Sequence, residues 1–243
     1  MWFTHFNKNL SFLRILNMPK RLIVIPAYNE EASIQHVLLE IKDIAPAVDV
    51  VVVNDQSSDS TAQKVRQVSG CALIDLPLRM GYWGALQTGL LYAYYKNYDS
   101  VLTMDADGQH LPEYVPVMFE ELEKDKIDVV IGKCLERGDV SKKIAWKFLR
   151  WLTGLQIKDL TSGFRAYSKK ALALLVQAEL TVFDNADLAT LILLTQEKCS
   201  IKEIRVAIAK RRAGKSKLFE SPIKIMRYIC YSIILSLSKR KLK

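Results

Sequence analysis

Short apolar runs that alternate with helical patterns constrain the fold of this 243-residue chain most strongly. Runs rich in Val, Ile and Leu occur at 22–25, 49–53, 72–76, 101–104 and 128–131, and helical periodicity separates them at 32–44, 60–68, 84–95 and 112–124. Continuous apolar runs of this kind are typical of parallel strands that are buried on both faces. The pattern therefore predicts an α/β fold in which helices flank a mostly parallel central sheet.

Beyond residue 132 the alternation is weaker, although further elements are expected. They are a Lys-rich helix at 141–152, a turn at 161–164, helices near Ala171 and Leu188, and a strand at 201–208. The composition, 50% hydrophobic and 25% charged, excludes a disordered, collagen-like or disulfide-scaffold protein. The four cysteines form no CxxC pair, which suits a reducing compartment and gives no zinc signal.

Polar segments follow three of the predicted strands, at the point where each strand ends. They are residues 26–30 (PAYNE), 54–61 (NDQSSDST) and 105–110 (DADGQH). Each segment alone has the composition of a turn or a helix cap. Because the carboxyl ends of parallel strands meet at one edge of a sheet, we expect the three segments to lie together where such sheets bind ligands.

Asp105 and Asp107 carry the clearest chemical signal in these segments. Two carboxylates this close repel each other unless a cation lies between them. Gln109 adds a third oxygen, and oxygen ligands favour Mg²⁺ or Mn²⁺ over zinc. A metal held in this way can also bind a diphosphate and neutralise the charge of a leaving nucleotide.

The three segments, with residues 161–167 (TSGFRAY) and 211–218 (RRAGKSKL), resemble the family 2 glycosyltransferases in order and spacing. Within that family the chain looks most like the dolichol- or polyprenyl-phosphate sugar synthases, over about residues 20–218. The resemblance implies a GT-A nucleotide-diphospho-sugar transferase fold, a nucleotide-sugar donor, a divalent metal and inversion at the anomeric carbon.

The resemblance also implies roles for individual residues on the donor side. The first loop holds the nucleotide, Asp55 bonds its base, and a Gly-rich segment at 79–85 covers it. The implied nucleotide-sugar-binding residues are Pro26, Ala27, Tyr28, Glu30, Asp55, Gly81, Gly84 and Asp105. The implied metal ligands are Asp105, Asp107 and Gln109.

On the acceptor side the resemblance implies a set of hydroxyl groups and cations that contact phosphate. These residues are Ser162, Arg165, Arg211, Lys215, Ser216 and Lys217. With Asp107 and Asp187, Arg165 and Arg211 complete the implied catalytic set.

Two positions depart from the family pattern. The paired Asp-Asp of the family is Asn54-Asp55 here, which keeps the base-binding carboxylate. An Arg is usual after the fifth strand, where this chain has Gly132-Lys133-Cys134, and Lys133 or Arg137 would have to substitute for it. Lys offers a point charge instead of a bidentate fork, so this departure bears on the donor geometry or the acceptor and not on metal binding.

Two kinds of acceptor fit the sequence. A lipid phosphate is already anionic and needs cations to hold it, whereas a saccharide hydroxyl needs a general base. The four cations Arg165, Arg211, Lys215 and Lys217 favour a polyprenyl phosphate such as a dolichyl or undecaprenyl phosphate. Asp184 or Asp187 would serve a saccharide hydroxyl in glycan or cell-envelope polysaccharide synthesis, although Asp187 also suits a helix N-terminus.

The formal net charge of +9 is concentrated at the end of the chain. Residues 202–243 contain 13 Lys+Arg and 2 Asp+Glu, so they account for all of the excess. We expect a glycosyltransferase domain at 19–218 and a basic amphipathic helix or tail at 219–243 that lies on a membrane surface or packs on the domain or a membrane-protein partner. A nucleic-acid-binding module is the least favoured alternative, because aromatic residues do not alternate with the basic ones.

Residues 1–18 are expected to form an amphipathic extension and not a signal peptide, because Asn7, Lys8, Asn9 and Arg14 interrupt the apolar residues. Met18 is an alternative start of the chain. The 13 residues at 225–237 are too few to span a bilayer, which takes about 20 apolar residues. We therefore expect a cytoplasmic, peripheral membrane enzyme.

Overall fold

A seven-stranded sheet forms the centre of the molecule in the computed structural model, which describes residues 19–133, 155–178 and 187–209. The strands lie in the order β3-β2-β1-β4-β6-β5-β7. Their bounds are β1 (Arg21–Ala27), β2 (Asp49–Asn54), β3 (Cys71–Asp75), β4 (Ser100–Thr103), β5 (Val129–Lys133), β6 (Arg165–Ser168) and β7 (Ile201–Arg205).

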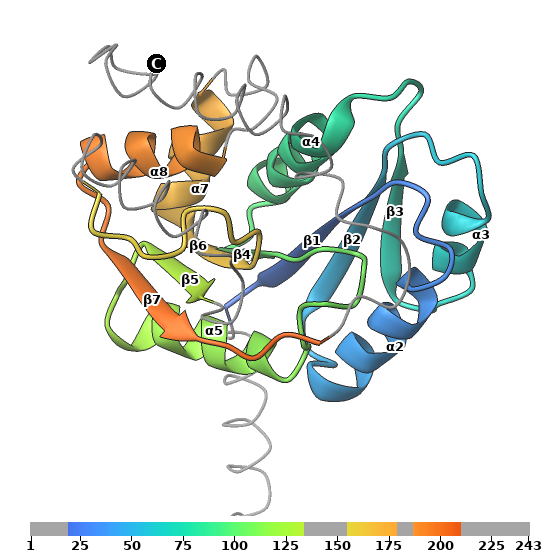
Figure 1. Cartoon of the computed structure of the whole chain (residues 1–243), viewed down its shortest axis with the longest axis horizontal. Helices are drawn as coiled ribbons and strands as arrows, with labels where there is room; N and C mark the ends of the chain where they lie inside the picture. Colours follow the sequence, from blue (N-terminus) through green and yellow to red (C-terminus); the bar gives the residue numbers. More distant parts are fainter. Residues whose placement is uncertain (1–18, 134–154, 179–186, 210–243) are drawn as a thin grey trace, which may run out of the picture.

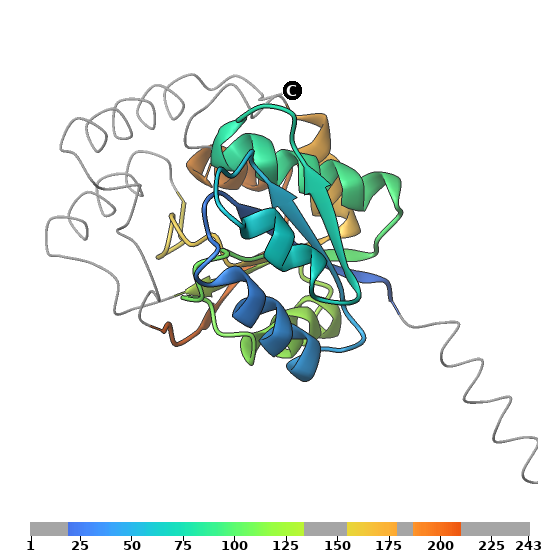
Figure 2. The same ribbon diagram turned by 90° about the vertical axis from the view of Figure 1, so that its right-hand side faces the viewer.

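Helices cover both faces of this sheet (Figures 1 and 2). Their bounds are α2 (Ile34–Ile44), α3 (Thr61–Arg66), α4 (Gly81–Tyr95), α5 (Tyr114–Lys124), α7 (Lys169–Gln177) and α8 (Asp187–Gln196). Alternate residues of β1 point to opposite faces, so Leu22 and Val24 pack with α4, α7 and α8, and Ile23 and Ile25 pack with α2, α3 and α5. The apolar run of β1 is thus buried on both sides, as a central parallel strand requires.

The predicted α/β class is confirmed, and one strand was missed. Parallel pairs join β1 to β2, β2 to β3, β1 to β4, and β5 to β7. Residues 165–168 form β6, which is antiparallel to both β4 and β5, although the sequence indicated only a turn before the next helix. Four residues of mixed polarity carry too little periodicity to be recognised as a strand.

Two other expectations for the second half of the chain have different outcomes. The last strand ends at Arg205 instead of residue 208, and Ile208 makes only an isolated bridge to His110. The Lys-rich helix expected at 141–152 lies outside the described residues. No helix in the described ranges is long and apolar enough to cross a membrane.

The loops that follow β1, β2 and β4 meet at one edge of the sheet. Strand β1 lies between β2 and β4 and is parallel to both, so the chain order reverses at β1. A reversal of this kind opens a crevice at the carboxyl ends of the strands, where α/β proteins bind ligands. The predicted convergence of the three polar segments is therefore correct.

Helix α4 reaches this edge with its first turn because it packs very closely on β1. A Cβ atom added at Gly89 would lie 2.2 Å from Val24 Cγ1, a distance that no side chain can occupy. Gly89 thus allows the helix to approach the strand, and Gly81 and Tyr82 come to lie beside the loops after β2 and β4.

Candidate active site

The loops after β1 and β2 are joined into one platform by hydrogen bonds between side chains and backbone. Asn29, which has a left-handed φ of 54°, donates its N–H to Ser57 Oγ at 2.9 Å. Its Oδ1 accepts the N–H of Ser58 at 2.9 Å, and Thr61 Oγ1 accepts the N–H of Glu30 at 2.8 Å. Asn tolerates left-handed backbone better than most residues, which explains its place at this turn.

This platform places the predicted first-loop residues beside Asp55. Pro26 and Ala27 end β1 and pair with Val53 and Asn54 of β2. The N–H of Asp55 donates to the carbonyl oxygen of Ala27 at 2.8 Å. Five of the residues predicted to bind the nucleotide therefore lie at the end of β1 or in the two adjoining loops: Pro26, Ala27, Tyr28, Glu30 and Asp55.

Asp55 has a role that the sequence did not reveal. Its Oδ1 accepts the N–H of Met80 at 2.6 Å, and its Oδ2 accepts the N–H of Gly81 at 2.9 Å. The carboxylate is only 3% exposed and lies at the N-terminus of α4, where the helix dipole favours a negative charge. Asp55 thus fixes the Gly-rich segment, in addition to the contact with the nucleotide base that the resemblance implies.

Tyr28 lies beneath the same Gly-rich segment. The guanidinium carbon of Arg79 is 3.9 Å from the centre of the Tyr28 ring, which is a cation–π contact. Gly84 permits the tight first turn of α4, since a Cβ at that position would lie 2.4 Å from Met80 Cβ. The segment at 79–84 is therefore held on the platform at both Tyr28 and Asp55.

The predicted metal ligands lie in the turn after β4. Gly108 has a φ of 75°, which favours glycine, and Asp107 Oδ1 accepts the N–H of Gln109 at 2.9 Å. Asp107 is 4% exposed, whereas Asp105 and Gln109 are half-buried. Two carboxylates and an amide in one turn are the oxygen donors that Mg²⁺ or Mn²⁺ prefers, so the residues fit such an ion.

No three His, Cys, Asp or Glu side chains gather around one point in the described ranges. The DADGQ turn supplies two carboxylates and takes its third oxygen from an amide. Such a site leaves coordination positions for water or a substrate diphosphate, as Mg²⁺ sites generally do.

His110 supports this turn from inside the protein. Its Nδ1 accepts the N–H of Asp105 at 3.0 Å, so its proton lies on Nε2, which is 3.7 Å from Asp105 Oδ2. The ring is 3% exposed and stacks on Phe164 with centroids 5.0 Å apart. A histidine in a turn is ordinarily solvated, so no local pattern indicated this buried, supporting position.

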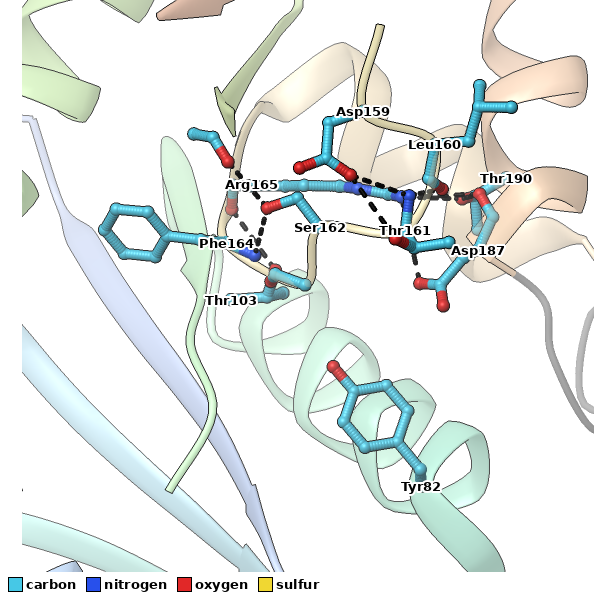
Figure 3. A network of polar contacts seen from close by, with 12 residues as sticks. Tyr82, Thr103, Asp159, Leu160, Thr161, Ser162, Phe164, Arg165, Asp187 and Thr190 are labelled. Carbon is cyan, nitrogen blue, oxygen red and sulfur yellow. Dashed lines mark hydrogen bonds and ion pairs between the residues drawn. The ribbon is translucent and has the colours of Figure 1, made fainter. Parts of the chain in front are cut away.

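Ser162 and Arg165 are brought to the site, but their side chains face the protein interior (Figure 3). Ser162 Oγ donates to the carbonyl oxygen of Gly132 at 2.7 Å. Arg165 is 1% exposed and donates to Thr190 Oγ1 at 2.9 Å and to the carbonyl oxygens of Leu160 and Asp187 at 3.1 and 3.2 Å. Both side chains thus hold the segment at 160–165 in place, which differs from the acceptor-phosphate contact expected of them.

Asp187 begins α8 and lies beside Arg165. Its Oδ1 is 3.8 Å from Arg165 Nη2, and the residue is 7% exposed. Burial raises the pKa of the Asp187 carboxyl to about 6, with Asp105 and Asp159 adding to the rise and Arg165 opposing it. Asp187 is therefore a titratable group near the DADGQ turn, at a pKa suited to proton transfer near neutral pH.

The departure at Asn54 has a structural reason. Its Nδ2 donates to Asp75 Oδ1 at 2.8 Å, and its Oδ1 accepts the N–H of Ser57 at 3.3 Å. An Asp at this position would place one carboxylate against another and could not donate. The amide of Asn54 thus provides the donor that the Asp75 carboxylate accepts at the ends of neighbouring strands.

The remaining predicted residues lie outside the described ranges. They are Arg211, Lys215, Ser216 and Lys217, together with Arg137, Asp184, the expected extension at 1–18 and the expected tail at 219–243. Lys133 ends β5, and its carbonyl oxygen accepts the N–H of Val206 at 3.1 Å.

Known proteins are similar to this chain in sequence and in fold. The chain is 32% identical over 160 residues to an undecaprenyl-phosphate mannosyltransferase of Micrococcus luteus, a match that covers 60% of this chain and 65% of that protein. It is 25% identical over 224 residues to a polyprenol monophosphomannose synthase of Mycolicibacterium smegmatis, which covers 84% and 83% of the two chains.

A solved structure shows the same architecture. Glucosyl-3-phosphoglycerate synthase of Mycobacterium tuberculosis, crystallised with Mn²⁺, uridine diphosphate and glucosyl-3-phosphoglycerate, superposes with a TM-score of 0.67. The superposition covers 90% of this chain and 78% of that one at 21% identity, so it shows the GT-A fold alone. Residues 22–175, more than half of the chain, match the sequence profile described as Glycosyl transferase family 2. The chain therefore belongs to the family 2 glycosyltransferases and is a glycosyltransferase of the GT-A fold.

Proposed function

We propose that this glycosyltransferase moves a sugar, with inversion, from a nucleotide-sugar donor to a polyprenyl phosphate, and that it depends on Mg²⁺ or Mn²⁺. The observation that carries the proposal is the meeting of the nucleotide platform and the oxygen-rich DADGQ turn at one sheet edge. The names of the two relatives, a mannosyltransferase to undecaprenyl phosphate and a polyprenol monophosphomannose synthase, support the choice of acceptor.

The residues of the platform bind and orient the donor. Tyr28 offers an aromatic face, Asp55 holds the N-terminus of α4, and the first N–H groups of that helix favour an anion. Asp105, Asp107 and Gln109 would hold the metal, whose chemistry is to neutralise the charge on the leaving diphosphate. The donor is thereby held with its leaving group against the turn after β4.

A polyprenyl phosphate needs no general base, because its phosphate oxygen is already anionic. The proposal therefore assigns its binding to cations, and Arg211, Lys215 and Lys217 remain the predicted ones. Arg165 takes a different role here: it fixes the segment at 160–165, which includes Gly163 beside Asp105. The basic tail at 219–243 and a membrane surface as its partner remain predictions from the sequence.

Transfer to a saccharide hydroxyl is a second candidate, and Asp187 is the observation that favours it. A buried carboxyl with a pKa of about 6, close enough to Asp105 to be influenced by its charge, has the properties of a general base. The structurally similar enzyme was crystallised with glucosyl-3-phosphoglycerate, which is not a lipid.

The two candidates make opposite predictions for Asp187→Asn. Transfer from a panel of labelled nucleotide sugars is measured with polyprenyl phosphate and, separately, with oligosaccharide acceptors. If the phosphate is the acceptor, the Asp187→Asn variant keeps transfer within about tenfold of the wild type, and Arg211→Ala abolishes it. A loss of about 100-fold or more in Asp187→Asn, the size expected for a lost general base, would favour the hydroxyl acceptor.

A further inference from the structure

We propose that Tyr82 is a positioning residue of the donor site, whose hydroxyl fixes the Asp105 carboxylate in the orientation that serves the metal and the nucleotide. This inference deepens the proposed function and rests on it. The family resemblance places Tyr82 only within the Gly-rich segment at 79–85 and assigns no individual role to its side chain, which lies in the first turn of α4 between Gly81 and Trp83.

The contact that supports this role is direct. Tyr82 Oη donates to Asp105 Oδ1 at 3.1 Å. The other carboxylate oxygen of Asp105, Oδ2, lies 3.7 Å from His110 Nε2, and the N–H of Asp105 donates to His110 Nδ1. Asp105 is thus held from the helix side by Tyr82 and from the turn itself by His110.

The contacts among Tyr82, Asp105 and His110 form a junction, and Gly163 lies against it. A Cβ added there would lie 2.9 Å from Tyr82 Oη and 3.2 Å from Asp105 Oδ1. The backbone of the segment at 160–165 therefore lies directly against the hydroxyl–carboxylate pair, and a side chain at Gly163 would push the pair apart. In Figure 3 the Tyr82 ring rises from α4 with its hydroxyl directed toward this segment.

Tyr82 is suited to a constant role as a donor. A phenol ordinarily carries its proton at neutral pH and can donate it to a carboxylate oxygen. The residue as a whole is 39% exposed. Tyr82→Phe keeps the ring in place, so it separates the role of the hydroxyl from the packing of the side chain.

The proposed role predicts a measurable effect of Tyr82 on metal affinity. Partners that orient a ligating carboxylate typically change metal affinity by about 10- to 100-fold when they are removed. Tyr82→Phe deletes only the hydroxyl. A matched control is Tyr94→Phe, because Tyr94 lies on the same helix with the same 39% exposure but near its other end.

The test measures Mn²⁺ binding to the full chain by calorimetry, once with saturating uridine diphosphate and once with saturating guanosine diphosphate. We expect Tyr82→Phe to bind Mn²⁺ about tenfold more weakly than the wild type and Tyr94→Phe to bind it equally well. Equal binding by Tyr82→Phe and the wild type would overturn the role of Tyr82 alone. A wild type that binds no Mn²⁺ with either nucleotide would contradict the proposed function itself.

A second measurement tests the junction without metal or nucleotide. Gly163→Ala is expected to lower the Tm by about 3–10 °C, because the added methyl group meets Tyr82 Oη. In the Tyr82→Phe background the same change should cost clearly less, because the atom nearest to the methyl group is gone and only the more distant Asp105 oxygens remain. Equal losses in the two backgrounds would show that the hydroxyl does not lie against Gly163, and would overturn the proposal.

Discussion

Asp55, at the end of β2, accepts the backbone N–H of Gly81, at the start of α4, over a distance of 2.9 Å. The other carboxylate oxygen of Asp55 accepts the neighbouring N–H of Met80. One buried side chain therefore links the loop after β2 to the Gly-rich segment, 26 residues further along the chain. A nucleotide base that binds at Asp55 therefore lies beside the point where Asp55 holds the Gly-rich segment.

Asp55→Asn is expected to weaken both the fold and nucleotide binding. An amide offers one acceptor oxygen, so one of the two N–H groups loses its partner and faces an NH₂ group, at a cost of about 1–3 kcal/mol. Unfolding in urea and calorimetric titration with nucleotide diphosphates measure the two effects. Asp43→Asn, on the exposed side of α2, is the control and should change neither. Unchanged stability in Asp55→Asn would show that the bonds to α4 contribute little.

Arg165→Ala is expected to destabilise the protein by about 3–5 kcal/mol, because it leaves Asp187 buried without its cation and removes the Arg165 donor from the carbonyl oxygen of Leu160. Arg165→Lys should also be destabilised, because one ammonium group cannot replace a fork that reaches both Leu160 and Thr190. Urea unfolding measures both. A variant with wild-type stability and no transfer activity would instead restore Arg165 to the acceptor-binding role that the family resemblance implies.

The Asp187 carboxyl makes stability depend on pH in a defined direction. Its pKa is raised to about 6 in the folded protein, chiefly by burial, from 3.8 when exposed. The folded state then binds the proton more tightly, so this contribution is complete below about pH 4 and is lost as the pH rises through 6. Relative to the wild type, Asp187→Asn should therefore gain about 2–3 kcal/mol of unfolding free energy between pH 4 and pH 7.5.

The measurement is the difference in unfolding free energy between the two proteins across that range of pH. Comparing differences removes the contribution of every other titrating group that the two proteins share. A difference that stays constant with pH would mean that Asp187 titrates alike in the folded and unfolded chains.

Much of this fold was predictable because its signals are local. The strands of the first half are long apolar runs, and parallel pairing follows from the helices between them, so the convergence of Asp55 and Asp105 at one edge could be expected. The tertiary contacts were not predictable. No local pattern indicates that Asp55 caps a helix 25 residues away, that Arg165 is buried, or that His110 stacks on Phe164. The short strand β6 was missed for the same reason, since only its neighbours β4 and β5 define it.

Metal-dependent transfer to a lipid phosphate is tested most directly by measuring whether the labelled sugar enters a lipid or a water-soluble product. The full chain is incubated with Mn²⁺ or Mg²⁺, polyprenyl phosphate and a panel of labelled nucleotide sugars, and the products are extracted into organic solvent. We expect one labelled sugar to enter the organic phase, and expect this signal to disappear with EDTA and to fall at least about 100-fold in Asp107→Ala, which must remain folded. Undiminished transfer in EDTA or in Asp107→Ala would contradict the metal assignment, and label found only in water-soluble products would contradict the lipid acceptor.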